Sequence, residues 1–299
     1  MRPPTTALLI YPVTLLVGSL FSILSPTARG SRQSRYARPA SLAPSIAANV
    51  NLSPPNPVNY FARKDNIFNL YFVKVGWLWT TLAFVSLLVS QPAYSAPSAH
   101  QPRRLAQAAL RYSLATLVCF VITGGKCERV VAETSGNPAV AVAQAGSVSA
   151  GLEKMFTAAA CKAAGGSWTG GHDVSGHVFM LVLATSMLVF EAVGAMRAVS
   201  AGAEGDKKVD GEVDGQSEGE KVQVQSEDEQ GNWMRTWSLR LVGAVVGLGW
   251  WMLFMTSIWF HTWLEKWSGL LIALGTVYVV YVLPLNVPAW RDIVGIPGV

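Results

Sequence analysis

Long apolar blocks separated by polar segments dominate the pattern of the chain. Six blocks approach the roughly 20 mostly apolar residues that an α-helix needs to cross the ~30 Å hydrocarbon core of a bilayer. These blocks are residues 7–25, 72–90, 105–122, 177–196, 237–260 and 268–287. Backbone groups in hydrocarbon must pair within the chain, so the blocks predict helices rather than isolated strands. The pattern therefore predicts an all-α integral membrane protein with six transmembrane helices.

A few polar features modify these blocks. Lys74 and Arg240 lie near block ends, where long side chains can reach the membrane interface. Arg111 makes the third block the weakest, and Glu191 lies inside the fourth as either a structural carboxylate or a functional group. Pro284 is expected to terminate or kink the sixth helix.

The first block has a second interpretation. Residues 1–25 carry one basic residue, then an apolar run and small residues, which also describes a cleavable signal peptide. We expect a retained transmembrane helix, because the apolar run is long and no clear cleavage site follows it directly.

The connecting segments differ in character. Residues 26–58 are rich in Pro, Ser, Ala and Arg and predict a flexible linker. From residue 59 the chain becomes aromatic and amphipathic, which predicts an interfacial helix before the second transmembrane helix. Residues 201–231 have almost no large apolar side chain and predict a disordered acidic loop. The membrane-embedded bundle is expected to span residues 59–290.

Composition supports a membrane protein. Only 14% of the residues are charged and 51% are hydrophobic, whereas a soluble domain carries about 25% charged residues. The net charge of +5 conceals ten acidic and three basic residues within 201–231 and a basic remainder. Basic residues that bound apolar runs do not form the stripe of a compact nucleic-acid binder. Three cysteines are too few for a disulfide scaffold or a cysteine-rich metal site.

Topology follows from the number of helices. With six transmembrane helices, both termini share one membrane face with residues 91–104 and the acidic loop. The other face receives the loops 26–70 and 126–172 and the short turn after residue 260. Lysine and arginine are similarly numerous on both faces, so the positive-inside rule does not orient the chain.

Two histidines are the strongest candidates for chemistry. His177 begins the fourth block and His261 ends the fifth, so the topology places both at the same membrane face. Ionisable groups brought together from separate transmembrane helices suggest a functional site. Because histidine titrates near neutral pH, one ring can act as nucleophile or base and the other as acid. Alternatively, both rings bind lipid headgroups or loop carbonyls.

Neighbouring residues extend this hypothesis. Glu265 lies four residues after His261, where its carboxylate could fix the imidazole tautomer. Ser175 and Gly176 precede His177 at a predicted helix N-terminus, which is a potential anion site. This combination fits phosphoryl transfer without a metal or cofactor. His172 and His177 are five residues apart, which is not the helical i, i+4 spacing, and no cysteine cluster completes a metal site.

Three strings of residues resemble a known family. They are GGSWTGGHDVSGHVF entering the fourth block, FHTWLEKWSG between the last two blocks, and NYFARKDNIFNLYFVKVGWLWTT before the second. Together they resemble the fungal branch of the fat storage-inducing transmembrane (FIT) family, over about residues 59–88 and most of 161–284. The order of the three strings along the chain agrees with that family.

The resemblance implies an enzyme of the endoplasmic-reticulum membrane with cytosolic termini and a lumenal active site. It implies hydrolysis of the phosphoanhydride of fatty acyl-CoA to acyl 4′-phosphopantetheine and adenosine 3′,5′-bisphosphate. The implied roles are lipid droplet formation and lipid homeostasis of the endoplasmic reticulum. The acyl chain is expected to lie among the helices, with the polar head at the histidines.

The resemblance also assigns roles to residues. His261 would attack phosphorus, His177 would protonate the leaving group, and Glu265 would stand where related lipid phosphatases place an Asp. The supporting or phosphate-binding residues would be Ser175, Gly176, Asp173 and His172.

The sequence departs from the related enzymes at two positions, and the first departure removes a positive charge that such enzymes use to hold phosphate. Met255 replaces an Arg that the related phosphatases carry six residues before the nucleophile, and Val174 replaces a Pro before Ser-Gly-His. The candidates for this charge are Lys126, Lys162 and Lys266, all expected at the lumenal face.

Other interpretations remain open from the sequence. The chain could be a non-catalytic protein that binds and partitions diacylglycerol or triacylglycerol. A transporter is disfavoured, because paired broken helices and an inverted repeat are missing. Cys127 and Cys161 flank the second lumenal loop and could form a disulfide, and Asn51 begins a glycosylation sequon.

Overall fold

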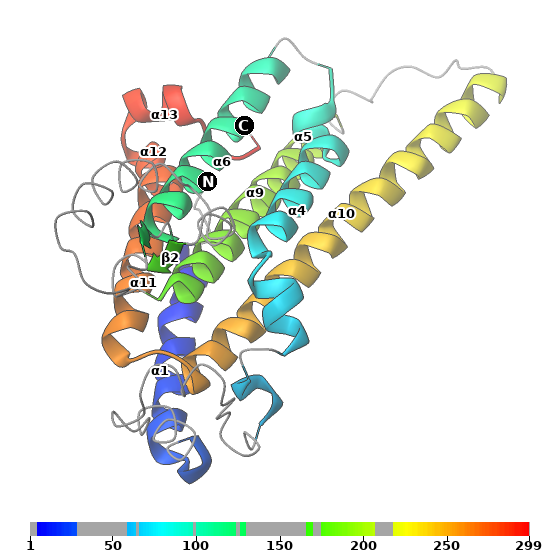
Figure 1. Cartoon of the computed structure of the whole chain (residues 1–299). Coiled ribbons are helices and arrows are strands. Elements are labelled where there is room, and N and C mark those ends of the chain that lie inside the picture. The colour runs from blue at the N-terminus through cyan, green and yellow to red at the C-terminus, as the bar shows by residue number, and fades with distance from the viewer. Residues whose placement is uncertain are drawn as a thin grey trace, which may run out of the picture.

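The computed structural model describes residues 5–28, 59–63, 66–97, 100–123, 126–129, 166–169, 175–206 and 218–298. It is a bundle of long helices around α9 (Figure 1). The long helices are α1 Ile10–Leu24, α4 Gly76–Ser90, α6 Gln101–Thr123, α9 Gly176–Asp206, α10 Glu218–Trp259 and α11 Trp263–Val277. The short helical elements are the 3₁₀ turns η1 Thr5–Leu9 and η2 Tyr60–Ala62, the π-helical turns η3 Asn69–Val73 and η4 Tyr278–Val282, and α5 Pro92–Ser95, α12 Leu283–Asn286 and α13 Pro288–Val294.

Five of the predicted transmembrane helices have the required length and apolar character within the described residues. They are Thr6–Leu24, Gln101–Ile122, Gly176–Ser200, Asn232–Trp259 and Trp263–Asn286. The predicted block at 72–90 differs, because its apolar α-helix α4 has only 15 residues. At 1.5 Å per residue, α4 covers about 22 Å and falls short of a ~30 Å hydrocarbon core.

The segment before α4 is not the single interfacial helix expected from its composition. It forms the 3₁₀ turn η2 and the π-helical turn η3, and a turn separates η3 from α4. Phe61 stacks on Phe68 with ring centroids 5.7 Å apart and meets Trp251 of α10 edge-on at 6.0 Å. These aromatic contacts fold the segment against the bundle, which explains why it does not remain one straight helix.

The helix α9 lies at the centre of the bundle. In its apolar window 78% of the residues are buried, the largest share of any candidate span among the described residues. Phe179, Leu183 and Met187 of α9 pack in one apolar cluster with Leu253 of α10 and Leu270 of α11. A helix that is apolar all round is typical of such a central position.

A buried ion pair connects α6 to α9. The Arg111 guanidinium donates two hydrogen bonds to the Glu191 carboxylate, at 2.6 and 2.8 Å, and both side chains are 1% exposed. Tyr94 and Tyr281 donate to the same carboxylate at 2.6 and 3.1 Å. The remaining guanidinium nitrogen donates to the Val294 carbonyl at 3.0 Å. Every element that carries these residues is therefore held to α9.

These contacts explain how charged residues are accommodated in an apolar bundle. A buried ion pair offsets its desolvation cost only when the geometry is good and further hydrogen bonds satisfy both partners. Arg111 and Glu191 meet both conditions, so the set fits a structural carboxylate, one of the two interpretations left open for Glu191. Burial raises the pKa of the Tyr94 phenol, and the Glu191 carboxylate raises it further.

The prediction of a disordered loop over 201–231 is wrong for part of that range. The helix α9 continues to Asp206, and α10 begins at Glu218, whereas residues 207–217 lie outside the described residues. Ala, Glu, Lys and Gln favour helices, and extending a packed helix needs no new nucleation. With 42 residues, α10 is about 63 Å long, and its N-terminal half projects from the bundle (Figure 1).

A small hairpin adds β-structure to the predicted all-α fold. The strands β1 Lys126–Arg129 and β2 Gly166–Thr169 pair antiparallel, with Cys127 opposite Trp168. This pairing brings residues 126–129 and 166–169 together, although they lie far apart in the sequence. Cys161 and Asn51 lie outside the described residues, so the predicted disulfide and glycosylation site stay predictions.

The ion pair gives a stability prediction. Glu191→Gln removes the charge that compensates Arg111, and breaking a buried pair on one side costs about 3–5 kcal/mol. Purified Glu191→Gln should therefore unfold at a clearly lower temperature than the wild type in a thermal scan in detergent. The control is Asp292→Asn, which alters the exposed pair between Arg103 and Asp292, 3.8 Å apart and worth about 0–1 kcal/mol. Equal unfolding temperatures for Glu191→Gln and wild type would contradict this role.

Candidate active site

The connection between α10 and α11 positions His261. The helix α10 ends at Trp259, and His261 adopts a left-handed backbone conformation with φ of 62°. Few residues other than glycine adopt this conformation, although histidine does so more often than most. Thr262 then caps α11 by accepting from the Glu265 N–H, and the Glu265 carboxylate accepts from the Thr262 N–H. This reciprocal cap fixes where α11 begins and so fixes His261 beside it.

Glu265 also contacts the imidazole of His261. Its Oε2 atom lies 3.0 Å from His261 Nδ1, and both side chains are about 30% exposed. The contact was expected from one continuous helix, but the chain breaks its helix at His261 and reaches the same contact through the cap. With Glu265 ionised, Nδ1 donates and Nε2 holds the lone pair, which is the tautomer a nucleophilic imidazole requires.

The beginning of α9 is tied directly to α11. The Ser175 backbone N–H donates to the Glu265 carbonyl at 3.0 Å. The Ser175 hydroxyl accepts from the Val178 N–H at 3.3 Å and caps α9, and Ser175 is fully buried. Glu265 thus contacts His261 through its side chain and the α9 N-terminus through its backbone.

The two histidines lie side by side at this junction. The ring centroids of His177 and His261 are 5.9 Å apart, with 43° between the ring planes. The predicted convergence of the two rings from separate helices is confirmed. Reacting atoms stand about 3–3.5 Å apart before bond formation, so one phosphoryl group can contact both rings. One imidazole can then attack phosphorus while the other exchanges a proton.

The N-terminus of α9 offers further groups for an anion. Gly176 is the first residue of α9 and His177 the second. The first backbone N–H groups of a helix lack intrahelical partners and favour negative charge. The predicted residues His172 and Asp173 lie outside the described residues, as does Lys162. Their part in the site stays a prediction.

The candidates for positive charge have different surroundings. Lys266 is 1% exposed, and its ammonium donates to the Ser257 carbonyl near the C-terminus of α10. Met255, where related phosphatases carry Arg, packs with Ile258 and Trp259 in an apolar cluster. Lys126 begins β1. In the described part of the chain, no group of three or more His, Cys, Asp and Glu side chains could hold a metal ion.

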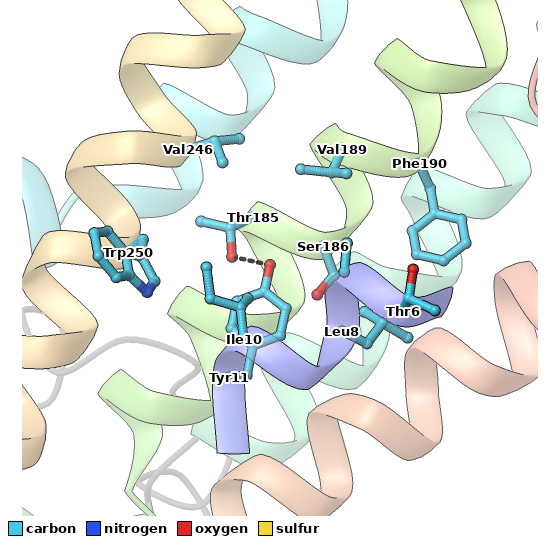
Figure 2. A pocket seen from close by; sticks show the side chains of 11 residues that line it. Thr6, Leu8, Ile10, Tyr11, Thr185, Ser186, Val189, Phe190, Val246 and Trp250 are labelled. Atoms are coloured by element: carbon cyan, nitrogen blue, oxygen red, sulfur yellow. Dashed lines mark hydrogen bonds between the residues drawn. The ribbon is translucent and has the colours of Figure 1, made fainter. Parts of the chain in front are cut away.

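Sequence reasoning missed an apolar cavity between η1, α1, α9 and α10. Its volume is about 260 Å³, and Tyr11, Thr185, Val189, Phe190 and Trp250 are among its lining residues. Figure 2 shows Tyr11 of α1 reaching across to Thr185 of α9, where the two hydroxyls are 2.9 Å apart. Thr185 follows His177 by eight residues, so the cavity lies about 12 Å along α9 from that histidine. Only the mixture of polar and apolar residues in the first block hints at it.

A family model described as "Fat storage-inducing transmembrane protein" matches residues 57–281. The acyl-coenzyme A diphosphatase fit1 of Schizosaccharomyces pombe is 28% identical over 96% of this chain and 87% of its own length.

Animal relatives match shorter stretches. The acyl-coenzyme A diphosphatase FITM2 of Drosophila melanogaster is 36% identical over 46% of this chain and 29% of its own length. That of Danio rerio is 30% identical over 51% of this chain and 55% of its own length. No solved structure matches the chain. The family match includes both histidines and most of the apolar helices, so this multi-pass membrane protein belongs to the fat storage-inducing transmembrane protein family.

Proposed function

We propose that the chain is a fatty acyl-CoA diphosphatase of the endoplasmic-reticulum membrane. It would hydrolyse the phosphoanhydride of fatty acyl-CoA to acyl 4′-phosphopantetheine and adenosine 3′,5′-bisphosphate, in support of lipid droplet formation and membrane lipid homeostasis. The observation that carries the proposal is the 5.9 Å separation of the His177 and His261 rings at one end of an apolar bundle. The names of the relatives from yeast and animals support the substrate.

The reaction would proceed in two steps. His261 Nε2 attacks one phosphorus of the diphosphate, and the bond from that phosphorus to the bridging oxygen breaks as His177 protonates the departing phosphate. Water then attacks the phosphohistidine, with His177 accepting its proton, and the P–N bond breaks to release the second product. Glu265 stabilises the positive charge that develops on His261 during attack. No metal takes part in either step.

Phosphate binding would rest on the N-terminus of α9. The backbone N–H groups of Gly176 and His177 at that terminus would donate to a phosphate held at the two rings. Ser175 fixes that helix start through its cap. We assign His172 and Asp173 to the same anion site. Its candidate cations are Lys126, Lys162 and Lys266.

The acyl chain would extend from the histidines into the bundle. The cavity lined by Val189 and Trp250 lies at a depth that a long acyl chain reaches when its diphosphate is held at His177. In this arrangement the apolar bundle holds the acyl chain, and the aqueous rim at the histidines holds the charged head. The active site would face the lumen, with both termini in the cytosol.

The same cavity favours a second function. Its apolar lining and the Tyr11 and Thr185 hydroxyls suit a chain of diacylglycerol or triacylglycerol. A non-catalytic protein of this kind would bind and partition neutral lipid. Its histidines would contact headgroups, changing them would alter lipid binding only modestly, and neither the wild type nor the variants would release adenosine bisphosphate from acyl-CoA.

The first prediction from this function concerns the two histidines. His177→Ala and His261→Ala should each lower the release of adenosine bisphosphate from acyl-CoA by at least about 100-fold, because removing a positioned acid, base or nucleophile costs that much. The assay uses purified full-length protein, with folding checked by thermal unfolding. His100→Ala, an exposed histidine outside the proposed site, is the matched control. Full activity in both site variants would reject the two-histidine mechanism, and an inactive wild type would reject the enzymatic function in favour of the lipid-binding one.

The second prediction tests Glu265 as a positioning residue. Glu265→Gln keeps a side chain that can complete the capping box but removes the charge beside His261. We expect kcat to fall at least about tenfold with little change in KM, because the imidazolium that forms during attack loses its partner. Without the carboxylate the pKa of His261 should fall, so the acidic limb of the pH profile should move to lower pH.

The alternative for Glu265 has a different signature. If the residue only caps α11, Glu265→Gln should leave both kcat and the pH profile unchanged. Thr262→Ser, which keeps the hydroxyl of the cap, is the control and should behave as the wild type.

The third prediction concerns the acyl cavity. Val189→Phe should reduce the cavity volume and raise KM for long-chain acyl-CoA several-fold, with a smaller effect on short-chain acyl-CoA. Val279→Phe places the same substitution at an exposed position of η4 and should change neither value. An unchanged ratio of KM values in Val189→Phe would show that the acyl chain binds elsewhere.

A further inference from the structure

A second, polar cavity lies at the end of the bundle that carries α13. Its volume is about 260 Å³. Its side chains come from the residue before α6, the first two turns of α6, and α13. They include His100, Arg103, Arg104, Gln107, Arg291 and Asp292, and the backbone after α13 completes the wall.

This cavity is remote from the histidine pair. The segment after α13 contacts α9 at Gly194, where an added Cβ would lie 2.4 Å from Pro297. Gly194 follows His177 by 17 residues, which is about 26 Å along a helix and close to the thickness of a bilayer core. In Figure 1, α13 lies at the top and the turn between α10 and α11 at the bottom. The polar cavity and the histidines therefore face opposite sides of the membrane.

The walls of the cavity are fixed by specific contacts. Gln107 and Arg103 of α6 donate to the Asp292 carbonyl at 3.1 and 3.3 Å. Gly295 has a φ of 73°, and an added Cβ would lie 2.4 Å from the Gln107 side chain. The Arg111 guanidinium donates to the carbonyl of Val294, the residue before Gly295, at 3.0 Å. The positions of the cavity's cationic groups thus follow from the packing of α6 against α13.

The charge of the cavity favours an anion. The lining includes three guanidinium groups and one carboxylate, that of Asp292. The Asp292 Oδ1 atom is 3.8 Å from Arg103 Nη2, and the Asp292 side chain is 74% exposed. The cavity therefore carries a formal charge of +2 with His100 neutral. Guanidinium groups bind phosphate oxygens in bidentate geometry. Basic pockets between transmembrane helices at a membrane face are typical sites for phosphorylated lipid headgroups.

We propose that this cavity binds the phosphomonoester headgroup of an anionic membrane phospholipid, in the leaflet opposite the histidine pair. Its volume is below the roughly 300 Å³ at which pockets for drug-sized ligands begin, which suits a headgroup. The lipid's acyl chains would remain in the bilayer beside α6 and α13. Arg103 and Arg291 bind the phosphate, and Asp292 limits the affinity by neutralising Arg103.

The experiment measures lipid binding to full-length protein by native mass spectrometry from detergent. The probe is phosphatidylinositol 4-phosphate, and phosphatidylinositol, which lacks the phosphomonoester, is the comparison lipid. Arg103→Gln/Arg291→Gln should weaken binding of the phosphorylated lipid at least tenfold and leave phosphatidylinositol unchanged. Arg240→Gln, on α10 over the Trp237 ring, is the matched control and should bind as the wild type.

A variant with the opposite effect separates binding from misfolding. Asp292→Asn removes the carboxylate and keeps the backbone carbonyl that Arg103 and Gln107 contact, so it should bind the lipid several-fold more tightly. His177→Ala should bind it as the wild type does. Loss of binding in His177→Ala would place the lipid at the active site and overturn the proposal.

The remaining outcomes distinguish a lipid from free phosphate. Millimolar inorganic phosphate should displace the lipid only weakly if the lipid is the ligand. Complete displacement would assign the cavity to soluble phosphate and overturn the proposal. Equal binding of the two lipids, or unchanged binding in the double arginine variant, would also overturn it.

Discussion

The Arg111–Glu191 ion pair is the interaction on which the arrangement of the bundle depends. An apolar helix has little to fix its rotation or depth among other apolar helices, whereas a buried charge pair is satisfied in few geometries. Glu191 receives hydrogen bonds from Arg111, Tyr94 and Tyr281. The polar contacts thereby define the position of α9 against α6, α5 and η4. Since α9 also carries His177 at its first turn, the ion pair helps to set where that histidine lies.

His261 is positioned in a different way. A short break between α10 and α11, closed by the reciprocal cap of Thr262 and Glu265, fixes its backbone and its ring. The backbone carbonyl of Glu265 also accepts a hydrogen bond from the Ser175 N–H, and this bond connects the helix cap to α9. The site therefore combines a central helix with a helix cap. Rigid elements of this kind hold reactive groups more accurately than long loops do.

Much of this could be predicted from the sequence. Apolar block length identified the long helices, and parity placed His177 and His261 at one face, which the 5.9 Å ring separation confirms. The partner of Arg111 could not be predicted, because it lies 80 residues away and depends on helix rotation. The turns before α4 pack against the bundle through Phe61 on Trp251, a tertiary contact that hydropathy does not register. The low hydrophobicity of the acidic segment does not reveal its helical parts, which follow from the helix propensity of its Ala, Glu, Lys and Gln residues.

The contacts of the segment that follows α13 have a consequence for the order of assembly. Val294 and Gly298 supply a carbonyl to Arg111 and an N–H to the Tyr94 hydroxyl. Ribosomes produce these groups after α6, α9, α10 and α11, so newly inserted helices wait with one guanidinium nitrogen lacking its final acceptor. This part of the polar network therefore closes only after the helices around it have been made.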